Sequence, residues 1–237
     1  MSDELIQAVS VTRQYTRGGE TLRVLDELEF SVARGAFTAL MGPSGSGKTT
    51  LLNLIGGLDR PDGGQVLVDG VDIGQLSDGD LARWRADHIG FVFQGFNLIP
   101  VLSAVENVML PLLLAPVSRK DRRERAAYAL ELVDLGDRMK HRPSQLSGGQ
   151  EQRVAIARAL VTDPTVLLAD EPTGDLDRES ADNVMELLRR LNKELGKTIL
   201  MVTHDPQAAR SAQTIAHLDK GRLGRLETVE ADAGAPA

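Results

Sequence analysis

One glycine-rich segment restricts what this chain can fold into more than any other feature. The sequence GPSGSGKT (residues 42–49) follows a short apolar run at residues 37–41 and opens a stretch of helical spacing that stops at Gly56 and Gly57. In such a loop, glycines let successive backbone N–H groups point inward, and the N-terminus of the helix favours negative charge. The segment therefore predicts a loop that binds nucleotide phosphates. Its flanks disfavour the alternative, a chance glycine-rich turn.

Side chains of this loop supply contacts that a polyphosphate needs. Lys48 can reach the β- and γ-phosphates, and the Thr49 hydroxyl is suited to binding Mg²⁺. We therefore expect both a nucleotide and Mg²⁺ at this loop. The residues expected to hold the phosphates are Gly42, Ser44, Gly45, Ser46, Gly47, Lys48, Thr49 and Thr50.

A second apolar run ends in two carboxylates, Asp170 and Glu171. Ligands of parallel α/β sheets bind beyond the carboxyl ends of the strands, so these acids are expected near the phosphate loop. Successive strand residues point in opposite directions, which separates their roles. Asp170 suits Mg²⁺, and Glu171 is positioned to polarise an attacking water. The alternative, an acidic strand end that caps the next helix, is disfavoured beside such a loop.

The order of the expected elements predicts a parallel α/β core with one insertion. Alternating strands and helices favour a parallel sheet. Between residues 103 and 160 the spacing is helical, and no convincing strand interrupts it. Extended segments are expected at residues 5–11, 21–32, 37–41, 65–69, 89–93, 165–169, 198–202, 214–218 and 222–226, and further helices at 80–87, 179–194 and 206–212.

Composition narrows the possible function classes. Lys and Arg number 27 against 34 Asp and Glu, so the net charge is −7, which disfavours non-specific binding to nucleic acid. The absence of cysteine excludes disulfides, cysteine-bound zinc and thiol catalysis. No apolar run approaches the roughly 18 residues of a membrane span, and the acidic start MSDELIQAVS lacks the apolar region of a signal peptide. We expect a soluble, intracellular, globular protein.

A third motif, LSGGQ (residues 146–150), precedes another helical run. Ser147 can cap that helix, and two glycines beside it form a second site able to bind an anionic group. Taken with GPSGSGKTT, Gln94, LLADEP, Asp177 and His204, the motif order resembles that of the ATPase subunit of ABC transporters. This resemblance extends over roughly residues 5–226.

The resemblance implies a fold and an assembly. ABC ATPases have a RecA-like P-loop NTPase core with an N-terminal antiparallel β-subdomain and an inserted α-helical subdomain. It implies one ABC ATPase domain at residues 1–228, with the core and β-subdomain at 1–93 and 161–228, the helical subdomain at 95–160, and a flexible tail at 229–237. Two such domains pair head to tail, with each ATP between the P-loop of one chain and the LSGGQ of the other. We expect a homodimer, and the sequence leaves a heterodimer with a second ABC ATPase as the alternative.

The resemblance also assigns roles to single residues. Gln94 would contact Mg²⁺ and the attacking water, and it begins the segment that senses the membrane partner. His204 would contact the γ-phosphate, Asp177 would communicate across the dimer, and Tyr15 would stack on adenine. The alternatives without a catalytic or binding role are a surface-loop position for Gln94, a hydrogen-bonded loop position for His204 and simple packing for Tyr15. The residues implied to bind the partner chain's ATP are Ser147, Gly148, Gly149 and Gln150.

Two segments of this chain are similar to one branch of the ABC ATPase family. Residues 90–100 and 103–108 resemble ATPases of bacterial lipoprotein-release and macrolide-efflux systems and a cell-division member. These work with membrane permease subunits, on separate or fused chains, at the cytoplasmic side of the inner (plasma) membrane. Asp175 and Glu151 depart from the common Asn and Gln, but neither position carries catalysis. The alternative is a soluble ABC ATPase acting on nucleic acid or ribosomes, which the net charge disfavours.

Overall fold

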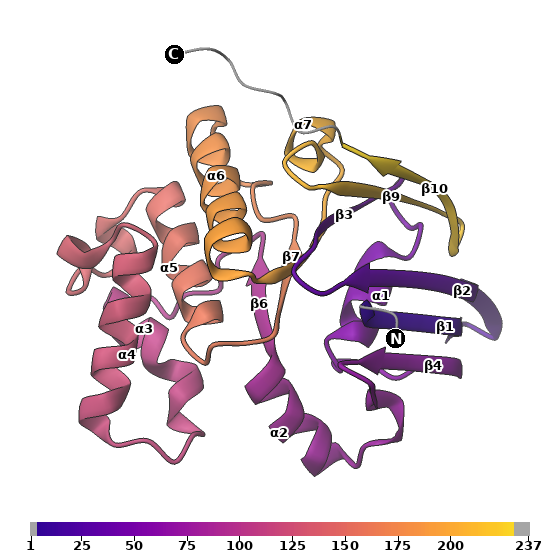
Figure 1. Cartoon of the computed structure of the whole chain (residues 1–237), viewed down its shortest axis with the longest axis horizontal. Helices are drawn as coiled ribbons and strands as arrows, with labels where there is room; N and C mark the ends of the chain where they lie inside the picture. Colours follow the sequence, from indigo (N-terminus) through magenta and orange to yellow (C-terminus); the bar gives the residue numbers. More distant parts are fainter. Residues whose placement is uncertain (1–3, 230–237) are drawn as a thin grey trace.

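The structure of the chain is a computed structural model that describes residues 4–229, and two β-sheets organise them (Figure 1). The larger sheet contains β3 (Phe37–Met41), β6 (Ile89–Phe93), β7 (Val166–Asp170), β8 (Thr198–Val202), β9 (Thr214–Asp219) and β10 (Arg222–Thr228). Their order across the sheet is β10-β9-β3-β8-β7-β6. All run parallel except β10, which pairs antiparallel with β9. The predicted parallel core is confirmed.

The smaller sheet is antiparallel and comes mostly from the start of the chain. It contains β1 (Glu4–Arg17), β2 (Glu20–Ala33), β4 (Gly63–Val68) and β5 (Val71–Asp72), in the order β2-β1-β4-β5. Each neighbouring pair is antiparallel. The predicted β-subdomain is therefore confirmed. Strand β5 was not predicted, because two residues after a turn carry no alternating pattern.

Helices cover the sheets and form a separate cluster. Four helices lie between strands of the two sheets in the sequence: α1 (Lys48–Ile55), α2 (Asp78–His88), α6 (Arg178–Leu195) and α7 (Pro206–Ala209). The cluster on the left of Figure 1 contains α3 (Ala104–Met109), α4 (Arg119–Leu132) and α5 (Gly148–Leu160), with the 3-10 turns η2 (Leu110–Leu113), η3 (Gly136–Arg138) and η4 (Pro143–Gln145). In agreement with the sequence, no strand interrupts this described stretch.

The larger sheet is buried on both faces, and its strands alternate between two apolar clusters. In β7, Leu167 and Ala169 join the cluster that also contains the α3–α5 helices, whereas Val166 and Leu168 join the cluster with β1, β2 and β4. This period of two is the signature of a strand covered on both sides. The sheet thus forms the wall between the helical part and the β-subdomain.

Helix α5 approaches the sheet closely. A Cβ atom at Gly90 of β6 would lie 2.4 Å from the carbonyl oxygen of Ala159 on α5, so only glycine fits at this contact. The short distance fixes the last turn of α5 against the start of β6. The motif residues lie at the opposite ends of these two elements, Gln94 after β6 and Ser147 before α5.

Several boundaries differ from the sequence expectation, and the largest difference is in β1, which was expected at residues 5–11 and spans Glu4–Arg17. Helix α7 ends at Ala209 and not at residue 212, because the amides of Ser211 and Ala212 bond three residues back, to Ala208 and Ala209, and turn the chain into β9. The predicted flexible tail starts at 229, where the Val229 amide bonds to the Gln213 carbonyl at 2.9 Å. Residues 230–237 lie outside the described part.

Among residues 4–229, the helices are too short or too polar to cross a membrane.

Candidate functional site

The glycine-rich loop curls at the carboxyl end of β3 and leads into α1. Gly47, the residue before the helix, has φ 102°, and a Cβ there would lie 2.9 Å from the Val24 carbonyl oxygen, so the loop conformation requires glycine. The buried Lys48 ammonium donates to the carbonyl oxygens of Gly42 (2.8 Å) and Pro43 (2.9 Å). The ammonium thus lies across the loop, where it can donate to phosphate oxygens in place of these carbonyl groups.

The lining of the cavity beside this loop tests whether a phosphate fits. Gly45 and Gly47, with φ of 77° and 102°, line it together with Lys48, so backbone without side chains and one cationic residue border the space. The Ser46 hydroxyl is buried and unpaired among the described residues, but Ser46 does not line this cavity. The cavity has a volume of about 400 Å³ and is lined by Leu22, Val24, Ser44, Gly45, Gly47, Lys48, Thr49, Thr50, Glu171, Val202 and His204. The loop therefore fits a phosphate group.

Asp170 ends β7 directly beside the loop. Both of its carboxylate oxygens lie 3.4 Å from the Thr49 hydroxyl oxygen. Burial raises the pKa of Asp170 above its ordinary value, and the charge of Glu171 raises it further, while Thr49 and Lys48 act in the opposite direction. No group of three His, Cys, Asp or Glu side chains suited to a metal occurs within residues 4–229. A cation here would take oxygen ligands from Thr49, Asp170 and the nucleotide, as Mg²⁺ prefers.

Glu171 and His204 meet at the ends of neighbouring strands β7 and β8. The Glu171 carboxylate lies 2.8 Å from the His204 Nδ1 atom, and both side chains line the cavity of the loop. Glu171 has φ 50°, a left-handed conformation that is uncommon for a residue with a side chain. Its amide bonds to the Val202 carbonyl at 2.9 Å. The two predicted catalytic residues are therefore held together, with the chain turning sharply at the carboxylate.

Gln94 follows β6 and is not among the side chains that line this cavity. Its Nε2 atom donates to an Asp175 carboxylate oxygen at 2.6 Å, and its side chain packs against Gly174. Asp175 was noted in the sequence only as a departure from the common Asn. The structure assigns it a contact that no motif indicated.

The LSGGQ segment forms a hollow of its own. Ser147 caps α5 by accepting from the Gln150 amide at 3.3 Å, and the Gln150 side chain accepts from the Ser147 amide at 3.1 Å. The hollow has a volume of about 330 Å³ and is lined by Asp134, Leu135, Asp137, Arg138, Ser147, Gly149, Gln150, Arg153, Ser180 and Asn183. None of the residues that line the phosphate-loop cavity lines this hollow. Arg138 and Arg153, which line the hollow together with Asp134 and Asp137, belong to none of the predicted motifs.

Asp177 caps α6 next to that hollow. Its carboxylate accepts from the amide and the hydroxyl of Ser180, each at 2.9 Å, and Ser180 lines the hollow. The hydrogen bonds from the Ser180 amide and hydroxyl hold the pKa of Asp177 below its usual value. The carboxylate is thus fixed as an anion beside LSGGQ.

Tyr15 stands on β1 and is 40% exposed. Its hydroxyl donates to Asp59 at 2.8 Å, and the Arg13 guanidinium lies 4.7 Å from the ring centroid. Leu22, its cross-strand partner on β2, lines the phosphate-loop cavity, although Tyr15 does not. Arg13 and Asp59 hold the ring at one orientation, and no motif predicted a role for either residue.

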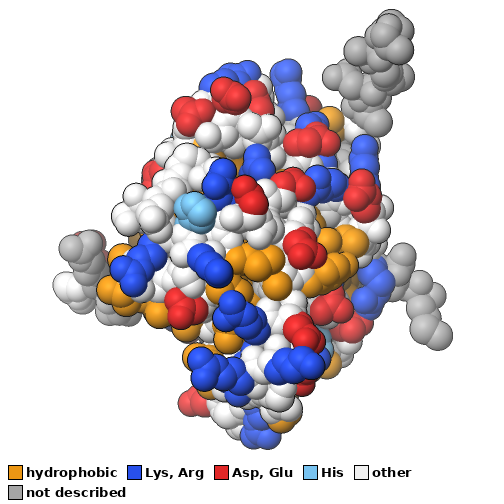
Figure 2. All heavy atoms as spheres, turned by 90° about the vertical axis from the view of Figure 1, so that its left-hand side faces the viewer, with side chains coloured by type: hydrophobic (Ala, Val, Ile, Leu, Met, Phe, Trp, Pro, Cys, Tyr) orange, Lys and Arg blue, Asp and Glu red, His pale blue; other side chains and the backbone are white. Residues whose placement is uncertain are grey.

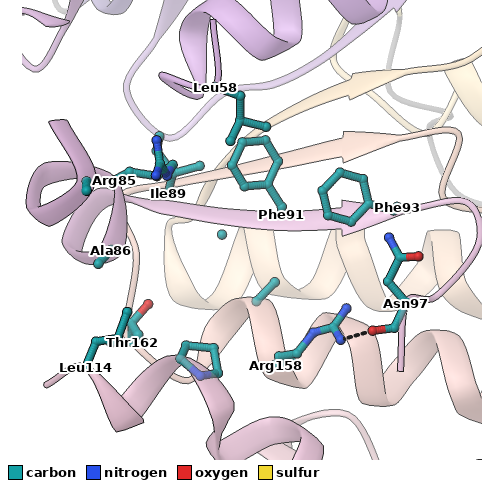
Figure 3. A pocket seen from close by; sticks show the side chains of 14 residues that line it. Leu58, Arg85, Ala86, Ile89, Phe91, Phe93, Asn97, Leu114, Arg158 and Thr162 are labelled. Carbon is teal, nitrogen blue, oxygen red and sulfur yellow. Dashed lines mark hydrogen bonds between the residues drawn. The ribbon is translucent and has the colours of Figure 1, made fainter. Parts of the chain in front are cut away.

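A mainly apolar groove of about 510 Å³ lies between the core and the helical cluster (Figure 3). In Figure 3, Leu58, Phe91 and Phe93 line one wall, and Arg158 of α5 bonds across to the backbone of Asn97. Leu114, 87% exposed, lies at the other end of the groove. Figure 2, which views the helical side, shows orange apolar side chains among blue and red charges on this face.

Similar arrangements occur in known proteins. Residues 25–174 match the family described as ABC transporter. The chain is 47% identical over 227 residues to MJ0796, an uncharacterized ABC transporter ATP-binding protein of Methanocaldococcus jannaschii. This match covers 94% of this chain and 97% of MJ0796. A dimeric structure of a post-hydrolysis state of MJ0796 bound to ADP and Pi has a TM-score of 0.86 and 45% identity, over 95% of this chain and 99% of that one.

A further relative is longer. The chain is 46% identical over 233 residues to the macrolide export ATP-binding/permease protein MacB 1/2 of Paracoccus denitrificans. The match covers 98% of this chain and 34% of that protein. This chain therefore corresponds to about a third of that relative.

Proposed function

This chain belongs to the ABC transporter family and is an ATPase, and from that premise we propose that it is the ATP-hydrolysing subunit of a bacterial transporter of the lipoprotein-release or macrolide-efflux type. The resemblance identified from the motifs is thereby confirmed at the level of the family. The observation that carries the proposal is the pair of glycine-rich helix starts, at Lys48 and at Ser147, which line separate hollows of one chain.

The residues in and beside the first hollow have distinct roles in the proposed reaction. The backbone of residues 42–47 and the Lys48 ammonium bind the phosphates. Thr49 and Asp170 would hold Mg²⁺, which neutralises charge on the phosphates when bound. Gln94 lies outside the hollow, bonded to Asp175, and would join these ligands once its side chain turns toward the hollow. Glu171 accepts a hydrogen bond from the attacking water and orients it, and His204, 2.8 Å from that carboxylate, contacts the γ-phosphate.

A second copy of the chain completes the site in this proposal. A phosphate loop encloses a triphosphate from one side only, whereas charge on the transferred group is stabilised by donors around all its oxygens. Ser147, Gly148, Gly149 and Gln150 of the second copy supply donors from the other side. Asp177, fixed beside them, then faces the same interface. The solved structures of MJ0796 described as dimeric support a homodimer.

The apolar groove of Figure 3 is where a membrane subunit would attach. Its exposed leucines are poorly suited to water, and MacB 1/2, named an ATP-binding/permease protein, carries a region like this chain within a longer one. We assign to the groove a segment of a permease subunit, which places the chain at the cytoplasmic side of the inner membrane. The net charge of −7 and the transporter relatives disfavour a nucleic-acid partner.

Co-purification from membranes tests this attachment. Affinity-tagged chain should bring down an integral membrane protein, and Leu114→Arg should reduce that yield about tenfold or more, because an interface hot spot contributes at least about 2 kcal/mol. Leu114 is 87% exposed, so the fold and the basal ATP hydrolysis of the variant should be unchanged.

Leu226→Arg is the matched control, since Leu226 is 59% exposed on β10, away from the groove. It should keep the wild-type yield of membrane protein. Equal yields from Leu114→Arg and wild type would contradict the assignment of the groove.

A further inference from the structure

Gln152, in the second turn of α5, is a fully buried amide that reaches two strand ends at once. Its Nε2 atom donates to the Phe93 carbonyl oxygen at 3.2 Å and to the Pro172 carbonyl oxygen at 2.6 Å. Its side chain has 0% exposure. Both hydrogen atoms of one nitrogen are thus used to hold two separate loops to the same helix.

The two carbonyl groups belong to the neighbours of the catalytic candidates. Phe93 directly precedes Gln94, and Pro172 directly follows Glu171. The strands that carry them, β6 and β7, are paired, with Phe93 opposite Asp170. The Gln152 amide therefore ties together the backbones from which the Gln94 and Glu171 side chains project.

Helix α5 also holds the loop after Gln94 at a second point. The Arg158 guanidinium donates to the carbonyl oxygens of Phe96, at 2.7 Å, and Asn97. Both of these residues have positive φ, 47° and 52°, so the loop turns sharply where Arg158 holds it. Arg158 and Asn97 line the apolar groove. One helix thus connects the groove, the LSGGQ segment and the two strand ends.

The side-chain amide of Gln152 lowers stability in one respect, so stability alone does not explain why a glutamine stands here. Its Oε1 atom is buried, and no described residue donates to it. A methionine side chain of similar length would remove that unpaired oxygen but would leave two carbonyl groups without donors. Because these gains and losses oppose each other, the effect of Gln152 on folding is expected to be small compared with its effect on where the two loops stand.

We propose that Gln152 is a positioning residue for ATP hydrolysis. It fixes Glu171 and Gln94 relative to one another, and it passes any displacement of α5 to both. The inference rests on the proposed roles of these two residues. The hydrogen bonds of the Gln152 side chain go to Phe93 and Pro172 and not to the phosphate loop, so we expect nucleotide binding through Lys48 to be independent of Gln152.

The test separates catalysis from binding. In Gln152→Met, kcat for ATP hydrolysis should fall about 10- to 100-fold, as for a small misplacement of catalytic groups, while the Kd for ATP stays within about threefold. The control is Asn192→Leu: Asn192 is also a buried amide, and its Nδ2 donates to the carbonyl oxygens of Gly35 (2.7 Å) and Lys197 (2.8 Å), away from the site. That variant should keep kcat within about twofold of wild type, because its loss is one of stability.

The outcomes are distinguishable. A wild-type kcat in Gln152→Met, or an equal loss of kcat in Asn192→Leu, would overturn the positioning role. An ATP affinity that falls as much as kcat would do the same, since it would indicate general disruption. Glu171→Gln is measured alongside, and normal hydrolysis by that variant would be a failure of the proposed function. Normal hydrolysis by Gln152→Met beside an inactive Glu171→Gln is a failure of this inference alone.

Discussion

Glu171→Gln is expected to lower kcat for ATP hydrolysis by at least about 10²-fold, because general-base catalysis contributes about 10²- to 10⁴-fold and an amide cannot accept a proton from water. ATP binding should be unchanged, since Lys48 and the loop backbone remain. Glutamine keeps the shape of the side chain and can still bond to His204, which lies 2.8 Å from the carboxylate. Phosphate release measures kcat, and calorimetry measures the Kd for ATP.

A trapped assembly should accompany this loss. If ATP closes two chains and hydrolysis reopens them, the variant with ATP should elute as a dimer, while wild type returns to monomer. Glu179→Gln is the control, because Glu179 is exposed in the first turn of α6 and does not line the cavity. Hydrolysis at the normal rate in Glu171→Gln would remove Glu171 from the reaction.

Lys48→Ala is expected to weaken ATP binding by about 10²-fold or more, as when one partner of a buried charge pair is truncated. Lys48 is 8% exposed and its ammonium donates to the carbonyl oxygens of Gly42 and Pro43, so phosphate oxygens can replace these two acceptors. Alanine leaves the loop without its positive charge. Titration of a fluorescent ATP analogue gives the Kd directly.

A second lysine offers the control for this variant. Lys197 also donates to a carbonyl oxygen, that of Pro164 at 3.0 Å, and pairs with Asp163 away from the phosphate loop. Lys197→Ala should leave the Kd for ATP unchanged. Equal affinities in Lys48→Ala and wild type would contradict the assignment of the phosphate site.

Most of the fold was predictable because its signals are local. Strands β3, β6 and β8 begin and end where the apolar runs do, since such runs fill both faces of a covered sheet. The phosphate loop was equally predictable, because its glycines encode a backbone shape. The N-cap at Ser147 was predictable as well, because its capping hydrogen bonds are formed within four adjacent residues, from Ser147 to Gln150.

Contacts between distant segments could not be predicted in this way. The bonds of Gln94 to Asp175 and of Tyr15 to Asp59 join residues 81 and 44 positions apart. The contacts of Gln152 could not be predicted either. Its two acceptors are distant backbone carbonyl groups, which every residue type has and which therefore leave no pattern in the sequence. Motif order identified the catalytic candidates, but only tertiary packing reveals which side chains hold them.

The central claim is that one ATP site is made by two chains, and complementation measures it most directly. Gly148→Asp puts a negative charge where the partner's phosphate would bind, and a Cβ at Gly148 meets only ordinary contacts, the nearest at 3.4 Å from Leu176. Lys48→Ala disables the other half of the site. Each variant alone should be inactive.

Mixed in equal amounts before ATP is added, the two variants should regain about a quarter of wild-type hydrolysis, since half of the dimers are mixed and each mixed dimer has one intact composite site of two. The measurement is the rate of phosphate release as a function of the mixing ratio, with a maximum at equal amounts. A rate that stays at the sum of the separate variants at every ratio would contradict the composite site.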